Sequence, residues 1–219
     1  MMPARRTQRA ERFAFKPHTK NVRSTEPTAT ERILRTRVEL RDVHPAIWRV
    51  VEVPANLSLF HMHDILQVLM GWHDYHVWAF EGKGRHFQDP NPEWNDPARP
   101  SLSPGKVKLG ELLTGEGETL CYNYDFGDNW WIELTVEAIG GPEPDVRYPR
   151  CVAGECAGPP EDCGGPPGYD ELLKARKNSK TKAAKELLAW AGPGWDPDAF
   201  DLAGINKALT GLPFPRRLQ

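Results

Sequence analysis

The chain has 219 residues, of which 39% are hydrophobic and 10% aromatic, and its net charge is −2. This length and composition support one sizeable core and exclude a wholly disordered chain. No apolar run approaches the ~20 residues of a membrane span, and no apolar segment follows the N-terminal arginines, so we expect a cytoplasmic protein without a membrane partner.

The N-terminal segment carries a charge opposite to that of the rest of the chain. Residues 1–24 contain seven Lys and Arg residues and one Glu, which gives a net charge of +6 and leaves −8 for the remainder. Arg5, Arg6, Arg9 and Arg12 lie in this segment. We expect residues 1–30 to form a flexible arm, which is either a solvated leader or a segment that neutralises DNA phosphates.

Alternating apolar and polar residues predict strands along the first two thirds of the chain. Two connections are indicated by His44-Pro45 and by the run Asp125-Phe126-Gly127-Asp128. A third tight turn, Gly82-Lys83-Gly84, predicts another short strand after it. The predicted strands span residues 33–40, 47–53, 77–81, 119–124 and 130–138.

A helix is predicted between Ser58, which is a good N-cap, and Gly71, which is suited to end a helix. Its apolar residues fall on one face at helical spacing. His63 lies at the edge of that face, whereas His61 lies on the other side. The two histidines therefore cannot act as one pair from a continuous helix, and His63 is the one placed near the core or a cleft.

The last third of the chain is predicted to be helical after an irregular segment. Residues 148–169 are rich in Gly and Pro, and we expect them to form a loop held by tertiary contacts rather than a regular helix or strand. Predicted helices follow at residues 169–177, 182–190 and 201–209, and a short helix is predicted earlier in the chain, at residues 108–113. No internal repeat or second core is evident.

These elements predict an α+β fold. We expect a single compact domain at residues 31–212, with a mixed or antiparallel sheet, one N-terminal amphipathic helix and C-terminal helices. The flexible arm precedes this domain, and residues 213–219 form a tail.

The chain contains four cysteines, three of which lie in the Gly- and Pro-rich segment at Cys151, Cys156 and Cys163. Without a signal peptide, reduced thiols or metal ligands are favoured over disulfides. Structural zinc sites more often use close Cys-x-x-Cys pairs, but three cysteines with His63 or His76 would complete four ligands. Buried thiols and a zinc module both remain open.

Histidines, carboxylates and aromatic residues suggest a polar cleft. The candidate residues are His63, Trp72, His76, Tyr124, Asp125, Asp128, Trp130, Glu161 and Asp162. Such carboxylates hold divalent metals or act as general acids and bases. The alternatives are that the carboxylates satisfy donors of their own turns and that Trp130 packs in the core. The sharpest hypothesis places His63, His76, Asp128 and Glu161 in one cleft.

Three blocks of the sequence carry a resemblance to a known family. HPAIWRVVEVPANLSLFHMHDILQVLMGW, YNYDFGDNWWIEL and YPRCVAGECAGPPEDCGGPPGYDELL, followed by WDPDAFDLAGIN, resemble the plasmid pRiA4b Orf-3-like family. The resemblance runs from Ile33 to Leu209. It implies a compact α+β domain and an association with mobile DNA, since members are often labelled resolvase-like passenger proteins of insertion elements.

The chain departs from this family pattern at three positions. Members commonly carry histidines at the positions of Trp78 and Ile132, and often a cysteine at the position of Gly158. If those positions serve a family site, this chain has lost or moved part of it.

A recombinase needs a nucleophilic Ser or Tyr surrounded by arginines. Arg35 and Arg37 share one strand face, but Tyr122 and Tyr124 lie elsewhere in the chain. Neither the arrangement of a serine resolvase nor that of a tyrosine recombinase is evident. The sequence therefore favours a binding or accessory protein associated with mobile DNA, which contacts DNA through the arm, over an enzyme. The alternative is a hydrolase or nuclease that uses the His/Asp/Glu cleft with zinc or another divalent metal.

Overall fold

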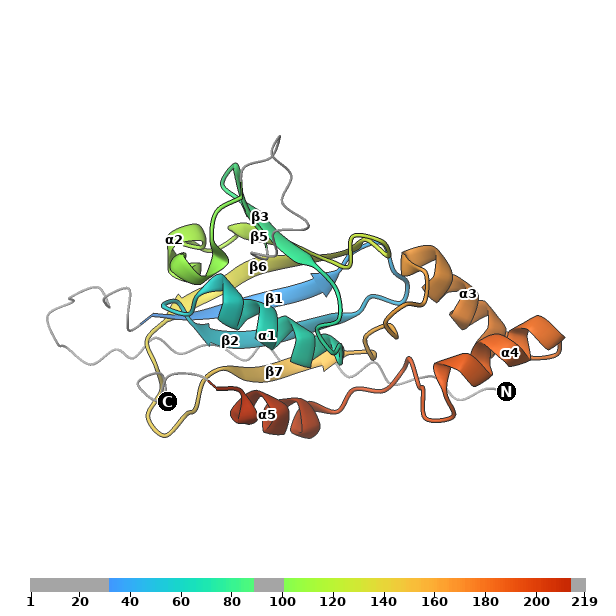
Figure 1. Ribbon diagram of the computed structural model, residues 1–219. Coiled ribbons are helices and arrows are strands. Elements are labelled where there is room, and N and C mark those ends of the chain that lie inside the picture. The colour runs from blue at the N-terminus through green and yellow to red at the C-terminus, as the bar shows by residue number, and fades with distance from the viewer. Residues whose placement is uncertain (1–31, 89–100, 214–219) are drawn as a thin grey trace, which may run out of the picture.

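A computed structural model describes residues 32–88 and 101–213 of the chain. Its centre is a seven-stranded sheet in the order β4-β3-β5-β6-β1-β2-β7, in which every neighbouring pair is antiparallel (Figure 1). The strands are β1 (Ile33–Leu40), β2 (Trp48–Pro54), β3 (Trp78–Gly82), β4 (Arg85–Gln88), β5 (Thr119–Tyr124), β6 (Trp130–Gly140) and β7 (Arg150–Glu155). The helices are α1 (Leu59–Met70), α2 (Leu109–Leu112), α3 (Gly165–Lys177), α4 (Lys182–Ala191) and α5 (Leu202–Gly211), with a 3-10 turn η2 (Pro104–Lys106). The predicted α+β class is confirmed.

Helix α1 has the predicted boundaries. The side chain of Ser58 accepts a hydrogen bond from the backbone N–H of His61, and Gly71 ends the helix in the left-handed conformation at φ 74°. The ring of His61 lies against the N-cap, with Nδ1 3.3 Å from the backbone nitrogen of Ser58. His61 thus belongs to the helix cap and His63 to the buried face, which confirms their separation.

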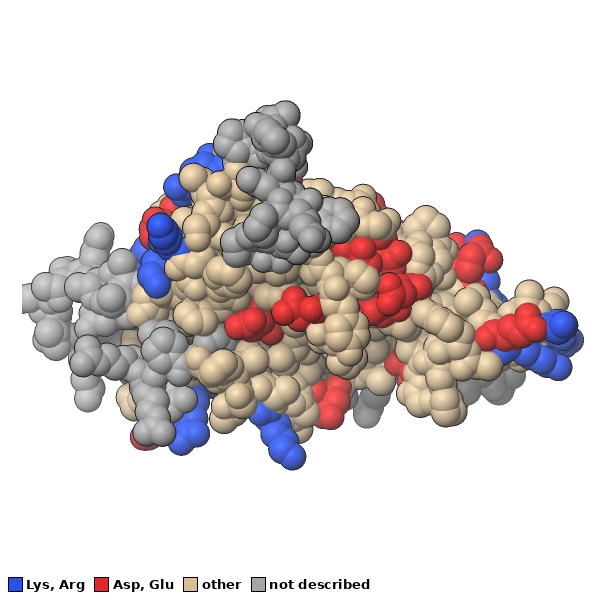
Figure 2. All heavy atoms as spheres, in the orientation of Figure 1, with Lys and Arg blue, Asp and Glu red and all other residues tan. Residues whose placement is uncertain are grey.

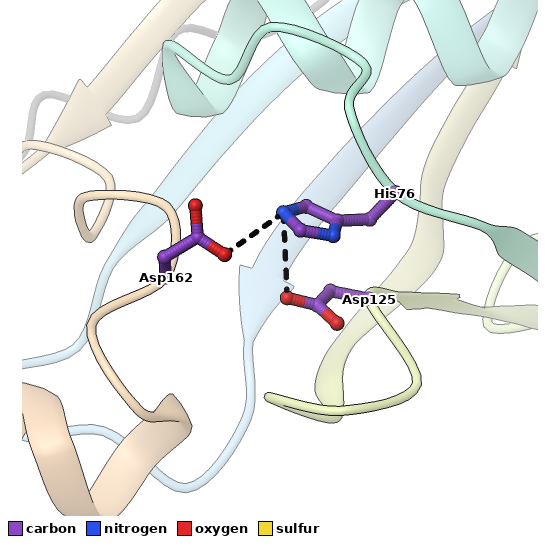
Figure 3. Close-up of side chains that lie close together, drawn as sticks. All are labelled: His76, Asp125 and Asp162. Atoms are coloured by element: carbon purple, nitrogen blue, oxygen red, sulfur yellow. Dashed lines mark ion pairs between the residues drawn. The ribbon is translucent and has the colours of Figure 1, made fainter.

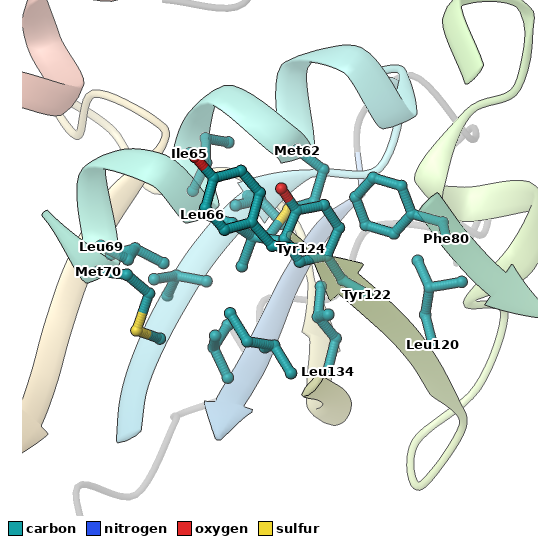
Figure 4. Close-up of a cluster of buried hydrophobic side chains, with 14 of the residues drawn as sticks. Met62, Ile65, Leu66, Leu69, Met70, Phe80, Leu120, Tyr122, Tyr124 and Leu134 are labelled. Carbon is teal, nitrogen blue, oxygen red and sulfur yellow. The ribbon is translucent and has the colours of Figure 1, made fainter. Parts of the chain in front are cut away.

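The core lies between α1 and one face of the sheet (Figure 4). Alternation along β1 places Leu34, Val38 and Leu40 on this face, where their side chains are buried. The buried side of α1 packs against residues of β3, β5 and β6. The contacting side chains in Figure 4 include Met62, Ile65, Leu66, Leu69, Met70, Phe80, Leu120, Tyr122, Tyr124 and Leu134. Burial of these side chains fixes α1, and with it the segment that follows Gly71.

The expectation that residues 148–169 form no regular structure is wrong at both ends of that segment. Residues 150–155 form β7, which pairs with β2 at the edge of the sheet. Glycine is suited to this strand because a Cβ at Gly154 would lie 2.6 Å from the ring of Phe200. Helix α3 begins at Gly165 with Pro166 and Pro167 in its first turn, where the missing N–H groups cost no helical hydrogen bond.

The C-terminal helices lie at the periphery of the sheet (Figure 1). Helices α3 and α4 extend beyond one end of the sheet and pack on each other, whereas α5 lies alongside β7. Asn206 of α5 holds that strand by accepting from the backbone N–H of Cys151 and donating to its carbonyl, both at 2.9 Å. The β7 end of the segment that leads to α3 is therefore anchored by α5.

None of the helices within residues 32–88 and 101–213 has the length and apolar character needed to span a bilayer. The predicted arm at residues 1–30 and nearly all of the predicted tail, residues 214–219, lie outside the described residues.

Candidate metal centre

Three of the predicted site residues converge where three loops meet (Figure 3). His76 precedes β3, Asp125 directly follows β5, and Asp162 lies between β7 and α3. Nε2 of His76 is 3.2 Å from Oδ1 of Asp162 and 3.7 Å from Oδ2 of Asp125. In the part of the chain that the structure describes, these three residues form the one group of three His, Cys, Asp or Glu side chains whose ligand atoms all lie within 4.8 Å of one another.

The nitrogen at the centre of this group is poorly satisfied by the protein. Nε2 of His76 is buried and has no hydrogen bond of acceptable geometry, although Asp162 lies within ion-pair distance. A buried polar atom without a hydrogen bond costs on the order of 1–3 kcal/mol. The nitrogen therefore points between two carboxylates without being satisfied by either, which is the arrangement expected of a ligand whose partner is a cation.

The two carboxylate oxygens of Asp125 have different roles: one stabilises the turn that follows β5, and the other faces His76. Oδ1 accepts hydrogen bonds from the backbone N–H of Gly127 at 2.9 Å and of Asp128 at 3.3 Å. This is the turn role that the sequence predicted for Asp125. Oδ2 faces His76 instead. Because Oδ1 is held by the turn, Oδ2 is fixed in position with little further loss of side-chain freedom.

Asp128 holds the neighbouring loop rather than the three-residue group. Its Oδ2 accepts a hydrogen bond from the backbone N–H of Gly164 at 3.0 Å. The loops approach closely here, because a Cβ on Gly165 would lie 2.3 Å from the backbone oxygen of Asp128. Asp128 thus ties the turn of Asp125 to the loop of Asp162 and positions the site without joining it.

Glu161 forms a second polar group beside the first. Its Oε1 accepts a hydrogen bond from the hydroxyl of Tyr124 at 2.5 Å. Its Oε2 accepts from the backbone N–H and from Nδ1 of His73, both at 2.9 Å. Burial, and next the hydrogen bond to Glu161, raise the pKa of Tyr124 above its usual value, so the phenol stays protonated and donates.

Aromatic rings pack around Tyr124, the residue whose hydroxyl binds Glu161. Trp72 stacks on Tyr124 at a centroid distance of 4.7 Å, and its Nε1–H donates to the carbonyl of Pro159 at 2.9 Å. Trp130 is fully buried and packs beside Trp72, with ring centroids 6.2 Å apart. Trp130 therefore packs in the core, which was the alternative to its place in the predicted cleft.

His63 lies in a buried network of its own. Its Nδ1 is 2.7 Å from the hydroxyl of Tyr122, and its Nε2 is 3.0 Å from Oδ1 of Asp74. The hydroxyl of Tyr122 accepts a hydrogen bond from Nε2 of Gln67 at 3.1 Å. Its ring stacks on Trp78 at 4.2 Å. Burial lowers the pKa of His63 to about 3. The hydrogen bonds pair His63 with Asp74, not with Asp128 or Glu161, so the hypothesis of one shared cleft is too broad.

Helix α1 and its neighbouring loops present an acidic surface. Figure 2 shows Asp and Glu side chains gathered across the middle of this face. Burial, and next the charge of Asp74, raise the pKa of Asp64 to about 6, whereas burial and then Glu161 raise the pKa of Asp74. Burial is the larger cause of both shifts, and the second cause, the charge of a neighbouring carboxylate, is one that a bound cation would offset.

The three cysteines of the zinc hypothesis do not form a ligand group in the part of the chain that the structure describes. The thiol of Cys151 lies 3.4 Å from the carbonyl oxygen of Ala153, and that of Cys163 lies 4.0 Å from the carbonyl oxygen of Gly165. Burial raises the pKa of Cys151 to about 11 and that of Cys163 to about 12, and it also raises the pKa of Cys156. Cys151 and Cys156 are buried, Cys163 is half-buried, and these positions match the alternative of structural cysteines.

Sequence reasoning missed His73 and Asp74, which follow Gly71 and Trp72 in the same short segment as His76. Two signals pointed to this segment. The first is the end of α1 at Gly71, and the second is the presence of three titratable residues, His73, Asp74 and His76, before the next strand. Neither signal predicts which carboxylates they meet.

The three departures from the family pattern lie at closely packed positions. Trp78 and Ile132 are buried in the core. A Cβ on Gly158 would lie 2.1 Å from the backbone oxygen of Met70, so this loop approaches the end of α1 too closely for a cysteine at that position.

Comparison with known proteins agrees with the resemblance in the sequence. The model of the family described as plasmid pRiA4b ORF-3-like protein matches residues 32–204. The uncharacterized protein y4hQ of Sinorhizobium fredii (strain NBRC 101917 / NGR234) is 33% identical over 186 residues, which cover 82% of this chain and 92% of that protein. The crystal structure of MM3350, a protein of unknown function from Methanosarcina mazei Go1, has a TM-score of 0.70 and 32% sequence identity, and the match covers 78% of this chain and 96% of that one. This chain therefore belongs to the plasmid pRiA4b ORF-3-like family.

Proposed function

We propose that this protein is a divalent-metal-dependent hydrolase whose metal ligands are His76, Asp125 and Asp162. The observation that carries the proposal is the buried Nε2 of His76, which faces two carboxylate oxygens without a hydrogen bond to either. One imidazole and two carboxylates suit Mn²⁺, Fe²⁺ or Zn²⁺. Three protein ligands leave coordination positions for water and substrate, as catalytic metal sites require.

The surroundings of the three ligands fit this chemistry. A divalent ion lowers the pKa of bound water toward about 7 and polarises an ester or amide carbonyl. The hydroxyl of Tyr124 donates its one proton to Glu161 and so holds that carboxylate in place beside the site. The crowded carboxylates around Asp74 favour a cation electrostatically. The site geometry thus favours the hydrolase alternative over the accessory role that the sequence alone favours.

The first test is direct titration of untagged, chelator-treated protein with Mn²⁺, followed by calorimetry. We expect one site per chain and a loss of affinity of at least about 100-fold in Asp162→Asn, because removing a ligand should cost no less than removing an outer-shell partner. Asp162 suits this substitution because its side chain is mostly in solvent.

Asp145→Asn is the matched control, because Asp145 is an exposed aspartate in the connection between β6 and β7 and its left-handed backbone, at φ 62°, also suits asparagine. It should bind Mn²⁺ within about threefold of the unmodified protein, a small change on the scale of outer-shell effects. Equal Mn²⁺ affinity in Asp162→Asn and the unmodified chain, or no binding to the unmodified chain at millimolar Mn²⁺, would contradict the proposed metal centre.

A second candidate function is binding to mobile DNA as an accessory protein, and the charge of the arm supports it. Residues 1–24 carry a net charge of +6, and the remaining residues carry −8. DNA phosphates would therefore be attracted to the arm and repelled by the body.

This second candidate predicts that full-length protein binds duplex DNA with an affinity that falls steeply as salt rises from 50 to about 200 mM. Deleting residues 1–30 should abolish the binding and leave the far-ultraviolet circular dichroism of the body unchanged. Fluorescence anisotropy with a labelled duplex measures both affinities. Equal binding with and without the arm, or none by the full-length chain at low salt, would argue against it.

A further inference from the structure

We propose that His73 is the proton-transfer residue of the hydrolytic site, with Glu161 and Tyr124 positioning its ring. This inference rests on the proposed metal-dependent function and adds a catalytic residue to it. Its basis is that an exposed imidazole is held by a buried carboxylate directly beside the metal ligands: the side chain of His73 is 67% exposed, whereas that of Glu161 is 9% exposed.

The contacts of His73 leave one ring nitrogen available to a substrate. Nδ1 of His73 lies 2.9 Å from Oε2 of Glu161, and the backbone N–H of His73 donates to the same oxygen. A neutral imidazole that donates through Nδ1 to a carboxylate has its lone pair on Nε2. A carboxylate that orients an imidazole in this way prepares the other nitrogen for general base catalysis.

Further contacts restrain the side chains of Glu161 and His73. The hydroxyl of Tyr124 donates to the second oxygen of Glu161, and it also accepts from the backbone N–H of Tyr75 at 3.1 Å. The ring of Tyr75 stacks on that of His73, with centroids 5.5 Å apart and planes 13° apart. A solvent-exposed side chain normally samples several rotamers, so these restraints on an exposed ring indicate a role in orientation.

The group formed by His73, Glu161 and Tyr124 adjoins the metal ligands through Glu161 and through Tyr124. Glu161, which binds His73, is followed in the chain by Asp162, which lies against His76. The ring of Tyr124 packs edge-on against that of His76 at 5.8 Å, while its hydroxyl binds Glu161. Two imidazole–carboxylate pairs therefore lie on the same two loops, one suited to hold a cation and the other to move a proton.

Ester hydrolysis at this site follows a balanced course. A water molecule gives one proton to Nε2 of His73 while its oxygen adds to the carbonyl carbon. The bond from that carbon to the leaving oxygen then breaks, and the proton returns from His73 to the leaving alcohol. Water and ester become acid and alcohol, and no oxidant or second substrate is consumed.

The test uses full-length protein loaded with Mn²⁺ and two chromogenic probes, p-nitrophenyl acetate and bis(p-nitrophenyl) phosphate. In His73→Gln the Mn²⁺-dependent rate on the hydrolysed probe should fall by about 100-fold or more, which is the usual effect of removing a general base. Mn²⁺ affinity should be unchanged, because His73 is not a ligand. His44→Gln is the matched control, since His44 is an exposed histidine in the turn before β2, and its rate should equal that of the unmodified protein.

A spectroscopic measurement separates orientation from general structural damage. In uniformly ¹⁵N-labelled protein above pH 8, the ring nitrogens of His73 should show the tautomer with the proton on Nδ1. In Glu161→Gln the proton should shift toward Nε2, the preference of an unrestrained imidazole. A proton on Nε2 in the unmodified protein, or a full hydrolytic rate in His73→Gln, would overturn the proposal.

The outcomes also separate this proposal from the metal centre. A protein that binds Mn²⁺ through Asp162 yet hydrolyses neither probe leaves the metal centre standing and overturns the role of His73. A protein that binds no Mn²⁺ overturns both.

Discussion

Replacing Arg49 with alanine should lower the free energy of unfolding by about 3–5 kcal/mol, one of the largest losses expected from a single substitution in this chain. Arg49 is almost completely buried in β2, and its partners are backbone carbonyls. Nε donates to the carbonyl of Leu69 at 3.2 Å, and Nη1 donates to that of Glu155 at 2.8 Å. The guanidinium also lies over the ring of Phe200 at 4.9 Å.

These contacts make Arg49 a link between three parts of the fold. Leu69 lies in the last turn of α1, where carbonyl groups lack helical partners and favour a positive charge. Glu155 ends β7, and Phe200 precedes α5. The alanine variant would leave buried carbonyls unpaired and a cavity beside Phe200, and both effects destabilise the folded state.

Urea unfolding of Arg49→Ala, Arg49→Met and the unmodified protein, without added metal, measures these contributions. Methionine fills most of the cavity but restores no hydrogen bond, so we expect an intermediate loss of about 1–3 kcal/mol. A loss below about 1 kcal/mol in the alanine variant would show that the surroundings satisfy the carbonyls without Arg49.

Much of the fold could be predicted because its signals are local. The alternation along residues 33–40 and the two caps of α1, Ser58 and Gly71, each depend on nearby residues alone. The strand at residues 150–155 could not be predicted in this way. Its pairing with β2 and the close approach of Phe200 to Gly154 are tertiary contacts, and these overrode the weak strand propensity of a Gly- and Pro-rich segment.

The candidate site was predictable in its residue types but not in its grouping. His76, Asp125 and Asp162 belong to three segments far apart in the sequence, and only the antiparallel pairing of β3 with β5 and the anchoring of the loop before α3 bring them together. No spacing rule connects such residues. His63 was grouped with them because α1 pointed it inward, but the buried hydroxyl of Tyr122 and the carboxylate of Asp74 hold it in a different network.

The acid sensitivity of this protein should depend on His63. A neutral His63 accepts from the hydroxyl of Tyr122 through Nδ1 and donates through Nε2 to Asp74, so every contact is satisfied without a charge. Protonation would remove the acceptor and place a positive charge in the core. Asp74 would stabilise that charge, but its side chain is 58% exposed and screened by water, whereas that of His63 is 3% exposed. Burial therefore prevails and lowers the pKa of His63 to about 3.

The sign of the effect follows from this pKa. An unfolded histidine titrates near 6.5, so the folded state binds fewer protons than the unfolded state between pH 6.5 and about 3. The contribution of His63 to stability is complete above pH 6.5 and is lost as the pH falls. At 1.36 kcal/mol per pH unit, acidification from pH 7 to pH 4 should cost about 3 kcal/mol through this residue.

Urea unfolding at pH 7 and pH 4 tests this expectation in the unmodified protein and in His63→Gln. Asp64 acts in the opposite sense, because a carboxyl pKa raised to about 6 adds stability as the pH falls through that value. The difference between the two proteins removes the terms that they share and reports on His63 together with its partner Asp74. His63→Gln should start from a lower stability at pH 7 and lose about 3 kcal/mol less on acidification than the unmodified chain. His44→Gln, which replaces an exposed histidine, should lose as much free energy of unfolding between pH 7 and pH 4 as the unmodified protein. If His63→Gln also lost that much, groups other than His63 would cause the acid sensitivity.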